Sequence, residues 1–255
     1  DNTEAQIVML SEAHRGCAVE NMQKCRQAAL RMEKSVKLME NGLQNDGKAY
    51  RAFQLANEAM LLQRSQTLIK SGKTVDPARI TWYPFQLAFI LHELSSFIDP
   101  TSEERRVVDL LWFPTGGGKT EAYLGITAFS IFLRRLRNPS DDGVTVIMRY
   151  TLRLLTLQQF ERASMLILAC ELLRKKYGIE GSEFSIGLWV GGKLTPNSLD
   201  EARTAIAKQK NGAQIPEEES NPCQIKLCPW CGARLSPADY EVQKLHKRMI
   251  IRSYY

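Results

Sequence analysis

The stretch that decides the expected fold is Phe113-Pro-Thr-Gly-Gly-Gly-Lys-Thr120. Three successive glycines let backbone N–H groups point at a cluster of negative oxygens, because no Cβ intrudes. Lys119 can bridge the β- and γ-phosphates of a nucleoside triphosphate, and the Thr120 hydroxyl can ligate Mg²⁺. We therefore predict a loop that binds ATP or GTP with Mg²⁺, in which Lys119 and Thr120 carry the catalytic role. Its predicted nucleotide-binding residues are Thr115, Gly116, Gly117, Gly118, Lys119 and Thr120.

Apolar runs on both sides of this loop predict the sheet that would carry it. Residues 107–113 form a short apolar stretch typical of a buried strand, and residues 144–148 and 184–190 have the same character. The helices expected around them cover 119–137, 154–177 and the residues after the Ser198–Glu201 capping-box pattern. Because strands and helices alternate, we expect right-handed βαβ units and an α/β fold with a mostly parallel sheet.

Upstream of this region the sequence is helical in character. Apolar positions at 4–41 and 48–70 predict two long helices joined by a polar turn, which indicates a helical hairpin with a structural or partner-docking role. A further helix is expected from Pro84, whose missing N–H costs nothing in a first turn, to Ile98. The expected domains are a helical region at 1–76, an ATP-binding lobe at 77–222 and the start of a cysteine-bearing insertion at 223–255.

The loop departs from the commonest phosphate-binding pattern at one position. That pattern, G-x-x-x-x-G-K-[ST], needs glycine where this chain has Phe113. What remains resembles motif I of superfamily 2 helicases, A-x-x-G-x-G-K-T. The upstream stretch Trp82-Tyr-Pro-Phe-Gln86 is similar to the Q motif of the same superfamily, in which a glutamine recognises adenine. An amide offers one donor and one acceptor, which suits adenine N6 and N7, so Gln86 is the predicted base-binding residue.

A second resemblance to these helicases follows the run at 144–148. The stretch from Tyr150 to Gln158 is similar to motif Ia, although Tyr150 replaces the usual proline and the glutamine lies one residue late. Thr and Arg at such a position can hold a nucleic-acid backbone without reading sequence. The predicted nucleic-acid contacts are Thr151, Arg153, Gly191 and Gly192, the two glycines because bare backbone can approach a phosphate.

Three strings together resemble one particular family. FPTGGGKTEAYLG, YTLRLLTLQQFERA and the upstream AFQLANEAMLLQ are similar to the helicase-like component of DISARM, a bacterial anti-phage system. The resemblance covers roughly residues 50–192. It implies a RecA-like first lobe, ATP-dependent engagement of foreign DNA, and a partner protein of the same system.

The cysteines near the end of the sequence predict a metal site. Cys223-x₄-Cys228-x₂-Cys231-Gly is typical of a zinc-ribbon knuckle, because two thiolates two residues apart wrap a tetrahedral Zn²⁺ well. A full site needs four ligands. Either a second C-x-x-C pair lies outside this segment, or Cys223 and His246 complete a Cys₃His site.

Hydrolysis needs carboxylates that bind Mg²⁺ and orient water, and no D-E-x-H or D-E-x-D sequence stands in a suitable place. We therefore expect this segment to bind nucleotide without turning it over alone. The first hypothesis is part of an ATP-dependent DNA helicase or translocase. One alternative is a nucleotide-dependent clamp that loads onto DNA without unwinding it, and another is a P-loop kinase or GTPase.

Composition is compatible with these hypotheses. The chain has 255 residues, 44% of them hydrophobic, which allows a sizeable core and argues against wholesale disorder. A net charge of +6 weakly favours polyanionic partners such as nucleic acid. No apolar stretch approaches the roughly 18 residues of a membrane span, and no signal-peptide pattern opens the chain. We expect a soluble cytoplasmic protein, and a fragment of a longer one because the first residue is Asp1.

Overall fold

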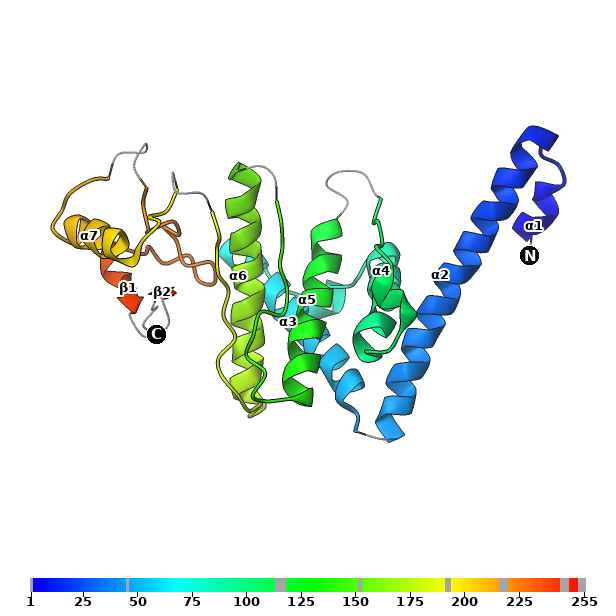
Figure 1. Ribbon diagram of the computed structural model, residues 1–255, viewed down its shortest axis with the longest axis horizontal. Helices are drawn as coiled ribbons and strands as arrows, with labels where there is room; N and C mark the ends of the chain where they lie inside the picture. Colours follow the sequence, from blue (N-terminus) through cyan, green and yellow to red (C-terminus); the bar gives the residue numbers. More distant parts are fainter. Residues whose placement is uncertain are drawn as a thin grey trace. The chain divides into compact units, whose positions relative to one another are not determined.

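The computed structural model of the chain describes residues 2–44, 46–112, 118–150, 153–190, 194–215, 220–243 and 248–251. Within these ranges the protein is mainly helical (Figure 1). The α-helices are α1 (Asn2–Ile7), α2 (Glu12–Gln44), α3 (Lys48–Lys70), α4 (Pro84–Ile98), α5 (Lys119–Arg137), α6 (Arg153–Lys176) and α7 (Leu199–Lys210). Short 3₁₀ turns and strands complete the elements, namely η1 (Pro77–Arg79), η2 (Glu103–Arg106), η3 (Pro237–Asp239), β1 (Tyr240–Gln243) and β2 (Arg248–Ile251).

The helix predictions are confirmed, with one break. Helices α3, α4 and α5 have the predicted bounds, and α6 begins one residue before the predicted start. The first predicted helix, at 4–41, is instead divided into α1 and α2. At α7 both capping-box bonds form: the Glu201 N–H donates to the Ser198 hydroxyl at 3.2 Å, and the Ser198 N–H donates to the Glu201 carboxylate at 3.3 Å. No described helix combines the length and the apolar character that crossing a membrane would require.

The predicted α/β fold with a RecA-like parallel sheet is wrong. Among the described residues the sheet consists of β1 and β2 alone, and these two strands are antiparallel. The predicted strands at 107–112, 144–148 and 184–190 form no ladder, and residue 113 lies outside the described residues.

The side chains of these runs show why the pattern misled. Val108 is 95% exposed and Trp189 is 99% exposed, so they are not the buried strand residues that the apolar runs predicted. An apolar, β-branched run signals a preference for strand, but a strand exists only where a second segment pairs with its backbone. At the second run the backbone is held by a side chain instead, because Arg134 donates through Nη1 to the Val144 carbonyl at 2.7 Å.

The chain divides into two compact units whose segments alternate along the sequence. The first unit comprises Asp1–Leu62, Asp76–Met148 and Ala169–Glu183. The second comprises Gln63–Val75, Arg149–Leu168 and Phe184–Tyr255. The phosphate-loop sequence belongs to the first unit and the cysteine segment to the second.

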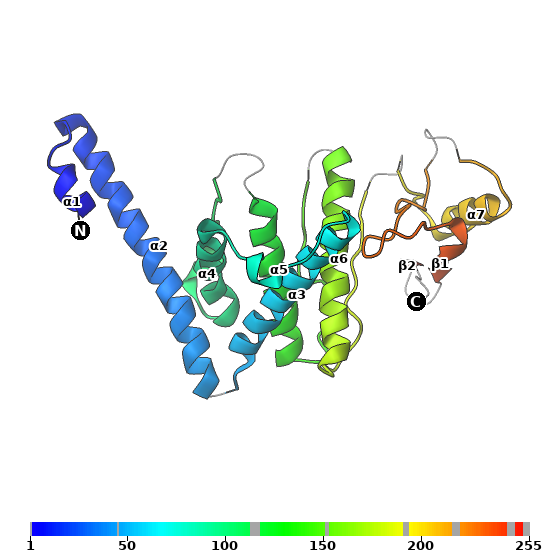
Figure 2. The ribbon, with the colours of Figure 1, turned by 180° about the vertical axis from the view of Figure 1, so that it is seen from behind.

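In the first unit, α4 lies between α2 and α5 and packs against both, as both views of the ribbon show (Figures 1 and 2). The contact between α4 and α5 is close because Gly125 faces α4. A Cβ at Gly125 would lie 2.9 Å from Ile90 Cδ1 and 3.0 Å from Trp82 Cη2, which is too near for any side chain without a shift. This packing brings the first turn of α4 against the start of α5, where the phosphate-loop sequence ends.

The second unit has a small core of its own. It consists of three buried residues, which are Ile206 on α7, Tyr240 on β1, and Cys223 in the segment between them. Leu235 and Val242 pack against these three. The Tyr240 hydroxyl donates to the Ile225 carbonyl and accepts the Ile225 N–H at 3.0 Å. These bonds satisfy a buried hydroxyl and fix the chain just before the cysteine pair.

Candidate nucleotide-binding site

The site is built on the first turn of α4. Tyr83 caps this helix and Pro84 occupies the first helical position, where no N–H is needed. One turn in, Gln86 reaches back so that its Oε1 accepts the Tyr83 N–H at 2.9 Å. Gln86 is only 3% exposed, so the predicted base-binding amide is a buried group.

The same amide reaches the beginning of α5. Gln86 Nε2 donates to the Gly118 carbonyl at 2.8 Å. Gly118 caps α5 with φ 85° and ψ 22°, a left-handed conformation that favours glycine. A Cβ on Gly118 would lie 2.7 Å from Gln86 Nε2, so any other residue would be strained by the positive φ and would displace the Gln86 amide.

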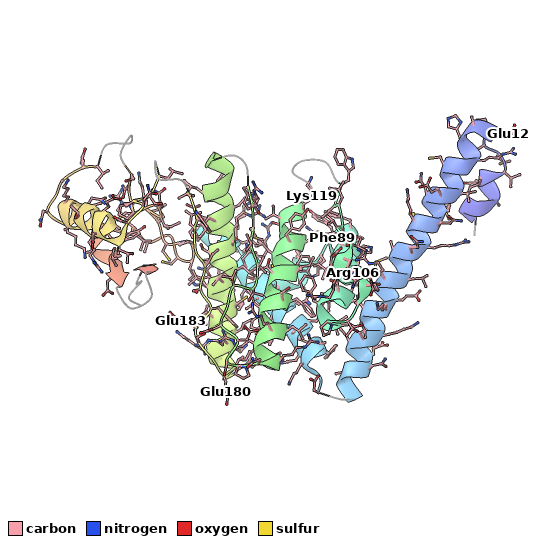
Figure 3. The ribbon with its side chains drawn as sticks, viewed as in Figure 1. Glu12, Phe89, Arg106, Lys119, Glu180 and Glu183 are labelled. Carbon is pink, nitrogen blue, oxygen red and sulfur yellow. The ribbon has the colours of Figure 1, made fainter. Side chains whose placement is uncertain are left out.

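Three of the predicted phosphate-binding residues can be placed. Gly118, Lys119 and Thr120 are half-buried at the start of α5, and Figure 3 labels Lys119 there, with Phe89 on the neighbouring α4. The Phe89 and Tyr123 rings meet edge to face, with centroids 5.8 Å apart, and so add to the contact between these helices. The other predicted residues of the loop, Thr115, Gly116 and Gly117, lie outside the described residues.

The predicted nucleic-acid residues are placed only in part. Arg153 is the first residue of α6, which agrees with its expected position at a helix start. Thr151, Gly191 and Gly192 lie outside the described residues. Arg153 belongs to the second unit and the start of α5 to the first. We therefore treat Arg153 as a candidate nucleic-acid contact and the start of α5 as a separate candidate nucleotide site.

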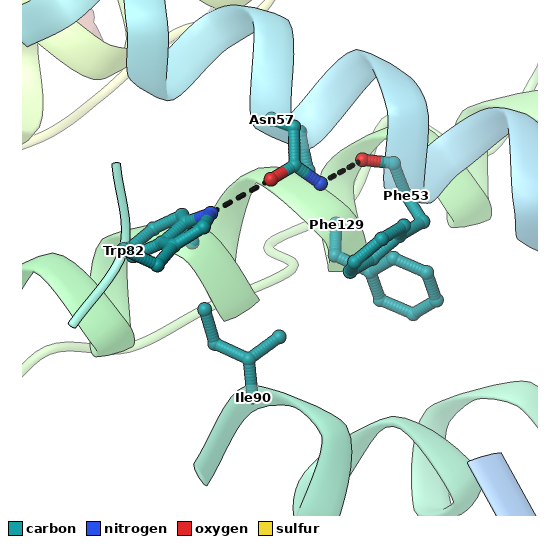
Figure 4. Close-up of a pocket in the computed structure, with 7 residues that line it drawn as sticks. Phe53, Asn57, Trp82, Ile90 and Phe129 are labelled. Carbon is teal, nitrogen blue, oxygen red and sulfur yellow. Dashed lines mark hydrogen bonds between the residues drawn. The ribbon is translucent and has the colours of Figure 1, made fainter. Parts of the chain in front are cut away.

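The aromatic residue of the Q-like stretch has a packing role. Trp82 Nε1 donates to Asn57 Oδ1 at 2.7 Å, and Asn57 Nδ2 donates to the Phe53 carbonyl at 2.7 Å (Figure 4). Ile90 and Phe129 also line the small cavity beside these residues. Its volume is about 10 Å³, which is room for one water molecule at most and far too little for a nucleotide base.

A charged cluster that the sequence did not predict lies in the same unit. Arg31 from α2 binds both oxygens of Asp109, at 2.7 and 2.9 Å, and His92 Nδ1 lies 3.0 Å from Glu93 Oε1 on α4. The Arg31 guanidinium lowers the pKa of Asp109, whereas burial raises the pKa of Glu93. The one sequence signal for this cluster was Asp109, a charged residue in the middle of the apolar run at 107–113.

The chemistry of this cluster favours an ion pair over a metal site. Ligand atoms of His92, Glu93 and Asp109 lie within 4.8 Å of one another, a spacing that a divalent cation could bridge. Asp109 already accepts a bidentate guanidinium, so a second cation on the same carboxylate would face the positive charge of Arg31. The cluster therefore ties α2 to residue 109, a few positions before the phosphate-loop sequence.

The cysteine segment of the second unit forms a tight turn. The Cys228 N–H donates to the Ala233 carbonyl at 2.7 Å, and the Gly232 N–H donates to the Cys228 carbonyl at 2.9 Å. Gly232 has φ 77°, the left-handed conformation that this turn needs. The Ala233 N–H also donates to Cys231 Sγ at 3.4 Å.

Helix α3 binds the backbone of this turn through two side chains. Gln66 Nε2 donates to the Trp230 carbonyl at 2.9 Å, and Lys70 Nζ donates to the Pro229 carbonyl at 2.8 Å. Both residues between the two cysteines are therefore anchored through their backbone.

The third predicted ligand has different surroundings. Cys223 is buried with Ile206 and Tyr240, accepts a hydrogen bond from Gln209 Nε2 at 3.7 Å, and has a pKa that burial raises to about 11. Among the described residues, the three thiols do not form a group with all its ligand atoms within 4.8 Å. His246, the alternative ligand, lies outside the described residues.

Comparison with known proteins adds to this geometry. No protein-family model matches the chain. The DISARM protein DrmA of Bacillus paralicheniformis is 41% identical to it over 224 residues. The chain is a DrmA-like sequence. The resemblance to a DISARM component that the motifs predicted is thereby confirmed.

The match covers most of this chain and a small part of DrmA. It takes in 82% of this chain but 20% of DrmA, so the DrmA-like chain spans about a fifth of the length of the curated relative it matches.

Replacing Asp109 by Asn should lower the free energy of unfolding at pH 7 by about 2 kcal/mol, because Arg31 loses a charged, half-buried partner. Asp109 has a lowered pKa when folded, so its contribution is present above the unfolded value of about 3.9 and is lost as pH falls through the folded value. The difference between the variant and the parent chain should therefore shrink below about pH 4. Urea unfolding at a series of pH values measures it.

The matched control is Glu103→Gln, which removes one charge from a surface pair with Arg106 and should change stability by no more than about 0.5 kcal/mol. Equal losses in Asp109→Asn and the control, or a loss that does not change with pH, would contradict the ion-pair assignment.

Proposed function

We propose that this chain binds ATP with Mg²⁺ at residues 113–120 and the start of α5. The observation that carries the proposal is the left-handed Gly118 immediately before Lys119-Thr120 at the N-terminus of a 19-residue helix. The first N–H groups of a helix have no partner within it, and the helix dipole places positive charge at the same end. Such an end, preceded by a glycine-rich sequence, suits a phosphate group.

Lys119 and Thr120 would divide the work at this site. The Lys119 ammonium would neutralise the β- and γ-phosphates, and the Thr120 hydroxyl would bind Mg²⁺. Mg²⁺ would supply charge neutralisation between the phosphates. Since no suitably placed pair of carboxylates occurs in the sequence, we expect binding without turnover by this chain.

Lys119→Ala should weaken binding of Mg-ATP by at least tenfold, because a charged contact to phosphate is worth about 1.5–3 kcal/mol. Titration of a fluorescent ATP analogue measures this affinity. Lys37→Ala is the matched control, because it removes the same charge from an exposed position on α2 and should leave binding unchanged. Unaltered affinity in Lys119→Ala would refute the nucleotide site.

We further propose that the protein acts in anti-phage defence as a DISARM component, through an ATP-dependent DNA helicase or translocase activity. The similarity to the DISARM protein DrmA and the net charge of +6 support this. DNA contact would be sequence-independent and made to the backbone, by the candidates Thr151, Arg153, Gly191 and Gly192. A partner protein of the same system would complete the assembly.

Binding to DNA should weaken steeply with salt, because each neutralised phosphate releases counterions. Removing one phosphate contact with Arg153→Ala should reduce the slope of log K against log salt by about one. Affinity measured on duplexes of two unrelated sequences at several salt concentrations gives this slope. A slope that Arg153→Ala leaves unchanged would exclude Arg153 from the interface, and a strong preference for one sequence would contradict backbone recognition.

We also propose that Cys228 and Cys231 hold Zn²⁺. Their C-x-x-C spacing, the left-handed Gly232 that follows and the N–H donor to Cys231 Sγ fit a thiolate knuckle. The ion would supply structural cross-linking, and the two remaining ligands would come from other segments. Cys223 fits this role less well, because its thiol is packed in the core with Ile206 and Tyr240.

Cys228→Ser and Cys231→Ser should each lower the zinc bound per chain, whereas Cys17→Ser, at an exposed position on α2, should not. Metal analysis after extensive dialysis measures bound zinc. Cys223→Ala should retain the metal and lose stability instead, since it leaves a gap in the core. Full zinc content in both knuckle variants would exclude the site.

A further inference from the structure

We propose that Gln86 positions the phosphate loop and does not read the nucleotide base. The inference rests on the proposed nucleotide binding and concerns which part of the nucleotide Gln86 serves. It starts from the two backbone bonds of the Gln86 amide, one to the Tyr83 N–H and one to the Gly118 carbonyl.

These two partners fix the orientation of the amide. An N–H can meet only the oxygen of the amide, and a carbonyl can meet only its nitrogen. Turning the amide over would place donor against donor at Tyr83 and acceptor against acceptor at Gly118. The backbone of two different helix starts therefore holds Gln86 in one arrangement.

This arrangement leaves the amide unsuited to base recognition. Reading an adenine edge requires one donor and one acceptor that face the base together. Each polar atom of Gln86 is directed at a backbone partner, which leaves one N–H and one lone pair of the amide unused. Because the residue is 3% exposed, a base cannot reach this remaining pair. A base could engage the amide only if this buried side chain moved outward, which would break the bonds to the cap of α4 and to the start of α5 together.

The bond to Gly118 instead fixes the direction of the backbone at the start of α5. Because a trans peptide is planar, the carbonyl of Gly118 and the N–H of Lys119 point in opposite directions. Holding the carbonyl toward Gln86 therefore directs the Lys119 N–H away from α4. The absence of a Cβ on Gly118 is what allows Gln86 Nε2 to come this near.

A residue that acts in this way should matter equally for every ligand that carries the same phosphates. Loss of the Gln86 bond should weaken binding of Mg-ATP, Mg-GTP and inorganic triphosphate with Mg²⁺ by the same factor, about tenfold for one bond of this kind. The ratio of the ATP and GTP affinities should not change.

Gln86→Glu tests the proposal on the whole chain. The introduced carboxyl can still accept the Tyr83 N–H, but when ionised it faces the Gly118 carbonyl with a second acceptor. All three ligands should therefore bind more weakly at pH 8. Burial raises a carboxyl pKa, so protonation below about pH 6 would restore a donor to Gly118 and recover the affinity, relative to the parent chain at each pH. Gln86→Leu should show the same uniform loss without recovery.

The outcomes separate this inference from the proposed function. A loss confined to ATP, with GTP and inorganic triphosphate unaffected, would show base reading and overturn the inference while leaving the nucleotide site in place. A uniform loss in Gln86→Glu that does not recover at low pH would assign Gln86 a general structural role and also overturn it. Should Gln86→Glu fail to fold, Gln86→Leu decides: a uniform loss with an unchanged melting temperature would support the inference, whereas an ATP-only loss, or a uniform loss with a lowered melting temperature, would overturn it. A parent chain that binds none of the three ligands would refute the nucleotide site itself.

Discussion

The hydrogen bond from Gln86 to the Gly118 carbonyl joins the starts of two helices that are 32 residues apart in the sequence. It depends on glycine at position 118, because φ there is positive and a Cβ would lie 2.7 Å from Gln86 Nε2, closer than van der Waals contact. A second glycine, Gly125, lets Trp82 and Ile90 approach α5 two turns later. The two glycines hold α4 close to α5 along the part of both helices that bears the proposed phosphate site.

Helix α2 is joined to the segment before the phosphate-loop sequence by charged side chains. Arg31 binds Asp109 through two hydrogen bonds, and Lys34 donates to Ser102 at 3.2 Å, so α2 is tied to the segment that leads toward the phosphate-loop sequence. The Arg31 guanidinium balances the charge of the Asp109 carboxylate. The helical region that sequence patterns indicated as a cap or docking surface is thus bonded directly to the residues that precede the proposed site.

The place of the glutamine illustrates how a motif and its function can separate. The aromatic residues and proline around Gln86 resemble a base-recognition motif, and the structure places this glutamine against Gly118 at the start of α5. What the resemblance did not contain is the geometry of its amide, which is engaged by two backbone groups. At Cys228 and Cys231 the structure has the tight turn that the C-x-x-C spacing predicts. Cys223, by contrast, is buried in a small core that the spacing of the cysteines did not predict.

The sequence by itself determined the helices, since periodicity, Pro84 in a first turn and the Ser198–Glu201 box act within a few residues of the chain. It also determined the glycine before Lys119, because a left-handed residue at a helix start is a local requirement. Only the tertiary structure decided whether the apolar runs at 107–112, 144–148 and 184–190 pair as strands, and among the residues that the structure describes they do not. A strand ladder needs a partner backbone, which local composition does not supply. The Arg31–Asp109 pair and the Gln86–Gly118 bond were decided there too, since each joins residues distant in sequence whose approach depends on helix packing.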